Sequence, residues 1–394
     1  MKALRIGIIG TGGRGVLGDS YLTPEDNVKV IAGADISSQK LDLFQARVRA
    51  KQGDPPNCYL DYREMITKEQ LDGVFVTSPD YCHEEQAVYA LEQGLGVYLE
   101  KPIAISIAGA DRILEAAYTH RSKLMLGHNM RYMSFVLKMK ALIDSGAIGE
   151  VKAIWCRHFI GYGGDAYFRD WHAERRYANS LLLQKGAHDI DVIHWLAGSF
   201  TKRVNGMGTL AVYDKLPRRS KDSQTPVDVT FNVNHWPPME QKDFNPVIDV
   251  EDLSMINMEL ANGVQASYMQ CHFTPDDCRN YTIIGTRGRI ENYGDHREGT
   301  TIELWDDRKG GFRLHGDATF RTSPGQGGHG GSDPAIVRSF FAVLRGQGTP
   351  SSTPQAARYS VATGCLGADS IRSGGMPFAV PALPDHLEKH PFHK

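Results

Sequence analysis

Apolar runs alternate with helix-like stretches from the start of the chain to about Arg121, and His83–Gln93 is one such stretch. Strand–helix alternation of this kind is typical of a parallel sheet with right-handed crossovers. The pattern therefore predicts an α/β Rossmann domain, with a parallel doubly wound sheet, over residues 1–128. The expected strands are Leu4–Gly10, Val28–Asp35, Asp72–Pro79, Gly96–Glu100 and Lys123–Asn129.

The pattern changes after a glycine-rich turn at Ser145–Gly149, because strand-like runs then follow one another with few helices between them. This predicts an α+β domain with a large, mostly antiparallel open sheet over residues 129–374, and an extended tail over 375–394. The expected strands are Val151–Phe159, Asp228–Asn234, Asp252–Leu260, Val264–His272 and Asn280–Ile284. The expected helices run from about Ser180 to Ala197 and from near Asp333, where a Pro follows in the first turn.

Length and composition are those of an ordinary soluble protein. A chain of 394 residues is too long for one core, so two domains are the default. The formal net charge of -2 gives no indication of nucleic acid or of an anionic membrane as a partner. We expect no signal peptide, no membrane span and no metal site. The six cysteines are scattered, which favours a reducing cytoplasm.

A glycine-rich loop follows the first expected strand and opens a helix. It reads Gly10-Thr-Gly12-Gly13-Arg14-Gly15, a G-x-G-x-x-G pattern. In this context the glycines allow a tight turn, close approach to a pyrophosphate and close helix–strand packing. The amides at the helix start would then bind the phosphates. The sequence predicts a dinucleotide site here, with these glycines and Arg14 in contact with the cofactor.

Asp35 ends the second expected strand, where an acid binds the ribose hydroxyls of NAD. A carboxylate there would repel the extra phosphate of NADP. The residues directly after it are Ile36 and two serines, with no Arg or Lys to reverse that preference. We therefore expect NAD, and NADP less.

Several short motifs follow the glycine-rich loop in a fixed order. They are Ser78-Pro79 with His83, Glu100-Lys101-Pro102, Asn129-Met130-Arg131-Tyr132, Gly146-Ala-Ile-Gly149 and Gly186-Ala-His188-Asp-Ile-Asp191. With the glycines, this ordered set resembles the glucose–fructose oxidoreductase / inositol dehydrogenase / rhizopine-catabolism (Gfo/Idh/MocA) family. The resemblance covers the whole chain, closely in the first half and loosely in the second.

The resemblance implies an active site between two domains, and activity on sugars, inositols or related polyols. It also implies a homodimer or homotetramer built through the open sheet. Lys101 would lie near the nicotinamide and the reacting hydroxyl. Its place after the fourth expected strand agrees, because open α/β sheets bind ligands at that edge and a lysine can relay a proton. The other cofactor contacts would be Ser78, Pro79, His83, Glu100 and Asn129.

The helix expected near Ser180–Ala197 places Gln184, His188 and Asp191 on one face. His188 is suited to general acid–base work, because its pKa lies near neutrality. By resemblance, His188 matches the family's catalytic-helix histidine and Asp191 the acid after it. Many members carry Asp where this chain has Gln184, which cannot titrate. Proton transfer must then rest on Lys101 and His188, or on a residue not identified from the sequence.

Further substrate contacts are expected just before that helix and elsewhere in the chain. Aromatic rings can contact the C–H face of a sugar, and arginines can bind an acidic substituent. This segment would favour an acidic sugar if it lines the site, but it also fits a charged, solvated connection. The candidate substrate residues are Arg131, Arg157, Trp171, His172, Arg175, Arg176, Gln184, Asp191 and His329, the last in a Gly-rich loop.

Three functions compete. The first is a dehydrogenase in which Lys101 and His188 take the hydroxyl proton while the cofactor supplies the redox chemistry. The second is an NAD-dependent glycosidase that works by transient oxidation, elimination, water addition and re-reduction. The His329-Gly-Gly loop followed by Asp333 resembles that branch. The third is a non-catalytic NAD-binding regulator, against which the presence of Lys101 and His188 argues.

Overall fold

The computed structural model describes residues 2–223 and 227–394, which form two compact units. The first unit consists of Met1–Tyr132, Gly325–Arg358 and Leu383–Lys394. The second consists of Met133–Pro324 and Tyr359–Ala382. The first unit thus takes two segments from the C-terminal part of the chain in addition to the expected cofactor domain.

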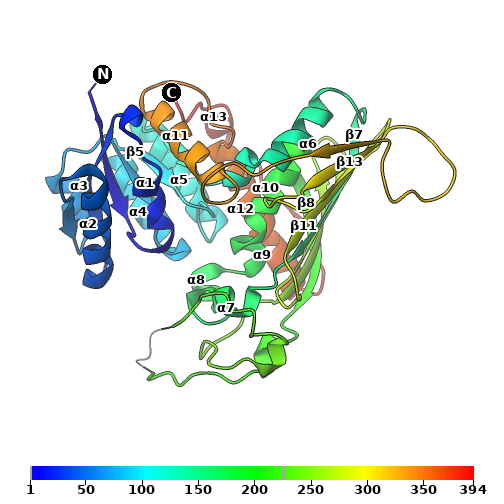
Figure 1. Cartoon of the computed structure of the whole chain (residues 1–394), viewed down its shortest axis with the longest axis horizontal. Helices are drawn as coiled ribbons and strands as arrows, with labels where there is room; N and C mark the ends of the chain where they lie inside the picture. Colours follow the sequence, from blue (N-terminus) through cyan, green and yellow to red (C-terminus); the bar gives the residue numbers. More distant parts are fainter. Residues whose placement is uncertain (1, 224–226) are drawn as a thin grey trace. The chain divides into compact units, whose positions relative to one another are not determined.

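A six-stranded parallel sheet forms the centre of the first unit, in the order β3-β2-β1-β4-β5-β6 (Figure 1). All five strands expected from the apolar runs are present, so the predicted Rossmann sheet is confirmed. The edge strand β3 was not expected, because it is three residues long and largely exposed. The strands are β1 Leu4–Ile9, β2 Val28–Ala34, β3 Asn57–Tyr59, β4 Gly73–Val76, β5 Gly96–Leu99 and β6 Leu124–Leu126.

Helices from both ends of the chain pack on this sheet. One of them, drawn in orange in Figure 1, is α11 (Ser332–Leu344), and its Phe340 ring meets Phe75 of β4 edge-on at 5.1 Å. Burial of such aromatic side chains is among the largest sources of core stability. The predicted helix near Asp333 is therefore present and belongs to the first unit. The other helices of this unit include α2 Ser38–Gln52, α3 Tyr62–Lys68, α4 His83–Glu92, α5 Ile107–His120 and α13 Asp385–Glu388.

The second unit is built on a nine-stranded sheet in the order β14-β13-β12-β11-β7-β10-β9-β8-β15. Only the pairing of β10 with β7 is parallel, so the predicted mostly antiparallel sheet is confirmed. The strands are β7 Val151–Phe159, β8 Thr201–Thr209, β9 Leu253–Leu260, β10 Gln265–Cys271, β11 Cys278–Gly285, β12 Arg289–Tyr293, β13 Thr301–Trp305, β14 Ala318–Arg321 and β15 Phe378–Ala379.

One expected strand was wrong. Asp228–Asn234 has no strand structure, although its alternation of apolar and polar residues is typical of one. The side chains of Val229, Phe231 and Val233 are all exposed, so this alternation marks no buried face. Without a buried face and a partner strand, nothing stabilises such a segment as a β-strand.

Helices of the second unit cover one face of its sheet, and α10 (Gly186–Ala197) packs on β7 and β10 (Figure 1). The helix expected from Ser180 to Ala197 is divided into α9 (Leu181–Gln184) and α10, with Lys185 between them. The Ser180 hydroxyl accepts from the Leu183 N–H and starts α9. The other helices of this unit include α6 Ser134–Asp144, α7 Gly163–Tyr167 and α8 Arg175–Ala178, while α12 Pro354–Arg372 runs from one unit into the other.

The residues predicted as an extended tail include two short elements, β15 and α13. Within the first unit, Leu387 and Phe392 are buried, and the Leu124 N–H of β6 donates to the Phe392 carbonyl. In residues 2–223 and 227–394, no helix has the length and apolar character needed to span a bilayer.

A buried charge network lies between α10 and the sheet of the second unit. Asp189 of α10 is fully buried and forms an ion pair with Arg279 of β11 at 3.1 Å. Tyr268 and Tyr281 donate their hydroxyls to the same carboxylate, and His158 lies 3.1 Å from it. Burial alone would raise the pKa of Asp189, but the Arg279 charge and the hydrogen bonds from His158 and Tyr281 hold it well below its usual range. Asp189 is therefore a charged anchor for α10.

We predict that Asp189→Ala strongly destabilises the protein, because it leaves the Arg279 guanidinium buried without its carboxylate. The expected loss is about 3–5 kcal/mol in the free energy of unfolding, measured by urea denaturation. As a control, Glu150→Gln removes one partner of the exposed Glu150–Lys152 pair and should barely move the unfolding midpoint. Equal midpoints for the two variants would contradict the anchoring role.

Candidate active site

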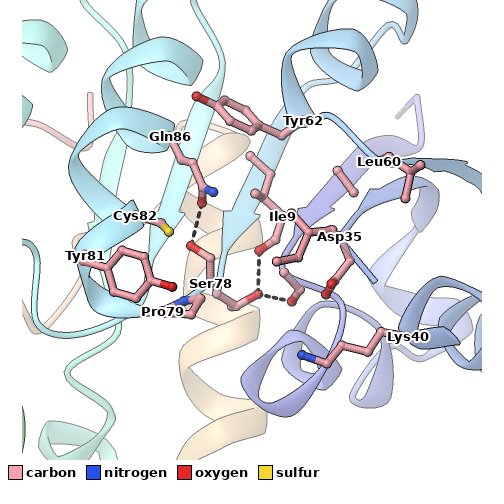
Figure 2. Close-up of a pocket in the computed structure, with 15 residues that line it drawn as sticks. Ile9, Asp35, Lys40, Leu60, Tyr62, Ser78, Pro79, Tyr81, Cys82 and Gln86 are labelled. Atoms are coloured by element: carbon pink, nitrogen blue, oxygen red, sulfur yellow. Dashed lines mark hydrogen bonds between the residues drawn. The ribbon is translucent and has the colours of Figure 1, made fainter. Parts of the chain in front are cut away.

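A pocket opens at the carboxyl ends of β1, β2 and β4 in the first unit (Figure 2). It holds about 660 Å³ of empty space, which includes space open to solvent. Its position is the one where open α/β sheets bind nucleotides. The lining residues are Ile9, Gly10, Gly12, Ala34, Asp35, Ile36, Lys40, Leu60, Tyr62, Thr77, Ser78, Pro79, Tyr81, Cys82 and Gln86.

The glycine-rich loop fits a dinucleotide pyrophosphate. Gly10 has φ of +83°, and a Cβ there would come within 2.7 Å of the Ser78 amide nitrogen. A Cβ on Gly15 would collide with the Gly10 carbonyl oxygen. Gly13 has φ of +45° with no atom within 4 Å of its Cβ position, so the loop is open on that side. The loop thus has the tight turn, the close helix–strand packing and the exposed backbone that a dinucleotide-binding motif requires.

Asp35 lines the pocket and also holds the glycine-rich loop in place through hydrogen bonds. One carboxylate oxygen accepts from the Thr11 N–H at 3.0 Å, and the other accepts from the Ser37 N–H at 3.0 Å. Lys40 lines the same pocket, with its side chain beside Gly12 (Figure 2). This cation was not predicted from the residues directly after Asp35, because α2 brings it back toward the loop.

Ser78 and Pro79 lie in the pocket wall at the end of β4, and the Ser78 hydroxyl donates to Gln86 at 2.5 Å. His83 is outside the pocket and fully buried. Its ring nitrogens lie 2.7 Å from the Pro102 carbonyl oxygen and 2.9 Å from the Ser78 carbonyl oxygen. His83 therefore ties the segment after Lys101 to the pocket wall.

A three-residue ion cluster joins the loop to the residue before Lys101. Arg14 donates to Glu100 through Nε and Nη2, at 3.0 and 2.9 Å, and to Asp333 through Nη1 and Nη2, at 3.0 and 3.1 Å. Burial alone would lower the pKa of Arg14, but the two carboxylates outweigh it and raise it. The Lys101 backbone N–H donates to the second Glu100 oxygen at 3.1 Å. We call Arg14, Glu100 and Asp333 the Arg14 cluster.

Two more of the expected residues join this cluster. The Asn129 amide donates to Asp333 at 2.9 Å, and the His329 ring lies 2.8 Å from the same carboxylate. Burial alone would raise the pKa of Asp333, but the contacts with His329 and Arg14 hold it well below its usual range. His329 is half-exposed, in a loop whose neighbouring glycines have positive φ. Arg131 is buried apart from these groups and donates to the Ser351 carbonyl.

In the second unit, Gln184 is the last residue of α9 and is buried, as is Asp191 of α10, whereas His188 is half-buried. The residue that sequence reasoning overlooked on this helix is Asp189, the charged anchor described above. An acid beside two expected site residues gives no sign of burial, and its partner Arg279 lies 90 positions further along the chain.

A half-buried aromatic cluster lies beside the break between α9 and α10. Lys185 donates to the Tyr162 hydroxyl at 2.6 Å and lies over the Tyr162 and Tyr167 rings at 5.0 and 5.5 Å. Tyr167 meets His172 edge-on at 5.3 Å, and Trp171 stacks on His172 at 3.7 Å. The two expected substrate residues Trp171 and His172 thus belong to one cluster with Lys185, Tyr162 and Tyr167, which were not among the candidates.

The arginines before α9 have carboxylate partners. Arg175 lies 3.2 Å from Glu251, and Arg176 lies 2.7 Å from Glu174. Arg169 lies 3.5 Å from Asp165 and is largely buried. Each of these three arginines thus has a carboxylate partner, and Glu251 is shared with Arg372.

Arg157 lies away from α10. On β7, Cys156 and His158 face Asp189, so the alternation of a strand turns Arg157 to the opposite face of the sheet. There its guanidinium donates to Asn280 at 2.8 and 3.2 Å. The structure therefore gives Arg157 no contact with the helix that carries His188.

Solved structures of similar fold include a levoglucosan dehydrogenase in complex with NADH and levoglucosan. It is 20% identical with a TM-score of 0.75, over 97% of this chain and 100% of that one. Another is myo-inositol 2-dehydrogenase from Lactobacillus plantarum, 18% identical with a TM-score of 0.69, over 96% of this chain and 100% of that one. At these identities the likeness concerns the fold.

Curated relatives match over shorter stretches. An inositol 2-dehydrogenase/D-chiro-inositol 3-dehydrogenase of Shouchella clausii is 31% identical over 198 residues, which are 49% of this chain and 53% of the relative. A 2,7-anhydro-N-acetylneuraminate hydratase of Mediterraneibacter gnavus is 25% identical over 241 residues, which are 61% of this chain and 62% of the relative. The chain thus spans less than two thirds of either relative.

Family models cover both parts of the chain. Residues 4–128 match the oxidoreductase family, NAD-binding Rossmann fold. Residues 140–380 match the oxidoreductase family, C-terminal alpha/beta domain. The two matches together cover most of the chain, so the chain belongs to the Gfo/Idh/MocA oxidoreductase family.

Proposed function

We propose that this protein is an NAD-dependent dehydrogenase that acts on a hydroxyl or ketone of a sugar or related polyol. The observation that carries the proposal is the placement of Lys101. It follows β5 directly, and its backbone is tied through Glu100 to Arg14 of the glycine-rich loop. A lysine fixed to the phosphate-binding loop is suited to act at the reacting end of a dinucleotide.

Each residue then has a defined task. When bound, NAD supplies the oxidising power by accepting a hydride from the carbon that bears the hydroxyl. Lys101 hydrogen-bonds the substrate oxygen and relays its proton. His188, half-buried on α10, is the histidine proposed to share this proton transfer in the second unit. A neutral substrate is favoured over an acidic one, because Arg169, Arg175 and Arg176 have carboxylate partners.

A second candidate is the redox-neutral cleavage or hydration of a sugar derivative. It is favoured by the relative named 2,7-anhydro-N-acetylneuraminate hydratase. In that case the same groups would oxidise the substrate transiently and then return the electrons, with no net NADH.

One assay separates these functions. The protein is incubated with NAD and with myo-inositol, levoglucosan and a panel of p-nitrophenyl glycosides, while NADH absorbance and released nitrophenol are followed together. NADH from a free sugar or polyol supports the dehydrogenase, and nitrophenol without NADH supports the redox-neutral reaction. Neither signal with any compound, despite NAD binding, would favour the non-catalytic regulator.

For the cofactor, we predict that NAD binds at least about tenfold more tightly than NADP, since the Asp35 carboxylate would face the extra phosphate. Asp35→Ala should weaken NAD binding and reduce the difference in affinity between NAD and NADP. Lys40→Met should increase this difference in affinity, because Lys40 is the cation of this pocket wall that could offset the charge of the extra phosphate. Calorimetric titrations of both nucleotides measure these gaps. Tighter NADP binding by the unmutated protein would reverse the assignment of Asp35.

We predict that Lys101→Ala lowers kcat by ~10²–10⁴, the usual loss for a proton-transfer group. NAD affinity should stay within about tenfold, since backbone amides bind the pyrophosphate. Lys29→Ala, at an exposed lysine of the same unit paired with Asp54, is the control and should leave both quantities unchanged. Near-normal turnover by the Lys101 variant would remove it from the mechanism.

We also propose that the protein assembles as a homodimer or homotetramer through the outer face of the nine-stranded sheet. Four large apolar side chains on this face, in adjacent strands, are 39–69% exposed. An exposed apolar patch of this kind is typical of a protein–protein interface. The four residues are Trp155, Met207, Met255 and Met269.

The expected effect of Met269→Glu is therefore dissociation toward the monomer, because a charge would be buried at the interface. Gel filtration with light scattering gives the mass of each species. Leu314→Glu, at an exposed position in the loop before β14, should keep the mass of the unmutated protein. If both variants and the unmutated protein are monomers, the sheet face has another role.

A further inference from the structure

Gln184, the last residue of α9, stands where the resemblance to the family leads us to expect a titrating group. The amide of Gln184 can bind a hydroxyl but cannot take up a proton. The next residue along the chain is Lys185, at the break between α9 and α10. Its environment differs from that of an ordinary surface lysine.

Lys185 is held in a fixed position by two tyrosines. Its Nζ lies 2.6 Å from the Tyr162 hydroxyl oxygen, a short hydrogen bond. The ammonium also lies over the faces of the Tyr162 and Tyr167 rings. Lys185 is the N-cap residue of α10 and precedes His188 by three positions. The aromatic cluster, which includes Trp171 and His172, contacts Lys185 through Tyr167.

The charges around Lys185 disfavour a permanent ammonium. Burial and the Arg279 guanidinium lower the pKa of Lys185 to about 7, against the opposing effect of Asp189, Asp277 and Asp295. His158 and His272 also face this region. Burial lowers the pKa of His158 to about 4 and that of His272 well below its usual range, so both rings are neutral at pH 7. The amine of Lys185 therefore exchanges a proton near neutrality.

We propose that Lys185, paired with Tyr162, is a further proton-transfer residue of the second unit and supplies the acid–base function that Gln184 lacks. The inference rests on the proposed dehydrogenase function. In the oxidation direction, Lys101 relays the proton of the substrate hydroxyl to Tyr162, which gives its own phenolic proton to the neutral Lys185 amine. The substrate carbon loses a hydride to the bound nicotinamide dinucleotide. The alcohol becomes a ketone, the dinucleotide is reduced, and the proton ends on Lys185.

The first test measures Lys185 directly in the unmutated protein. Trace acetic anhydride is applied at pH values from 5 to 11, and mass spectrometry quantifies acetylation at each lysine. Lys185 should show a labelling midpoint near pH 7. Lys202, an exposed lysine of β8 paired with Glu259, is the internal control. A midpoint for Lys185 near that of Lys202 would overturn the proposal.

The second test measures the role in turnover, with NAD and with myo-inositol or levoglucosan as probes. In the unmutated protein, kcat/KM should rise with pH through an inflection near 7, because the neutral amine is the base. Lys185→Met should lower kcat/KM by ~10²–10⁴ and remove this inflection. Lys185→Arg, which keeps the charge but cannot release it, should do the same, and Lys202→Met should do neither. Added methylamine should restore part of the rate of Lys185→Ala.

The outcomes separate this inference from the function on which it rests. Turnover with an unchanged pH profile in both Lys185 variants overturns the inference and leaves the dehydrogenase intact. Lost turnover without amine rescue, in variants with unchanged melting temperature, also counts against proton transfer by Lys185. If the unmutated protein turns over neither probe, the proposed function fails for these sugars. The labelling midpoint then still decides whether Lys185 titrates as the proposal requires.

Discussion

The first unit depends on one guanidinium shared by two carboxylates. Arg14 belongs to the glycine-rich loop, Glu100 to the end of β5 and Asp333 to the start of α11, so three distant parts of the chain meet at one charge. Both carboxylates are nearly buried, and loss of the arginine would leave two negative charges facing each other. This constraint aligns the loop that fits a pyrophosphate with the residue before Lys101. It also explains why residues 325–358 belong to the cofactor-binding unit.

The sequence predicted the features that local chemistry determines. Apolar runs marked the parallel strands because both faces of that sheet are buried, and the glycines marked the loop because only they fit its backbone. Contacts between residues that are far apart in the sequence could not be predicted from local patterns. Nothing near Asp333 indicates that its partner is Arg14, and nothing near Asp189 indicates Arg279. The irregular segment at Asp228–Asn234 shows that local patterns can also mislead. Alternation of apolar and polar residues predicted a strand there, but the segment pairs with no sheet.

Lysine side chains were the other source of difference between the predicted site residues and those found in the structure. Lys40 and Lys185 were not among the predicted site residues, because Lys40 belongs to none of the motifs and Lys185 lies at the edge of the helix face expected to carry Gln184 and His188. Their side chains reach the pocket wall and the aromatic cluster only through the path of the helices that carry them. In a family site, the backbone motifs thus identify where the cofactor binds. The residues that tune charge around it are found from the folded structure.

Charge balance in the second unit also bears on the kind of substrate. Arg169 and Arg175 are paired with acids, and the pKa of Lys185 is lowered to about 7. A site of this kind offers little net positive charge to compensate a buried anion, which is costly without partners. It does offer ring faces and hydroxyl groups at Tyr162 and Tyr167. Those groups match the alternating C–H and O–H faces of a neutral polyol. Burial and the Arg279 guanidinium, by lowering the pKa of Lys185, would keep its amine able to accept the proton in the proposed reaction.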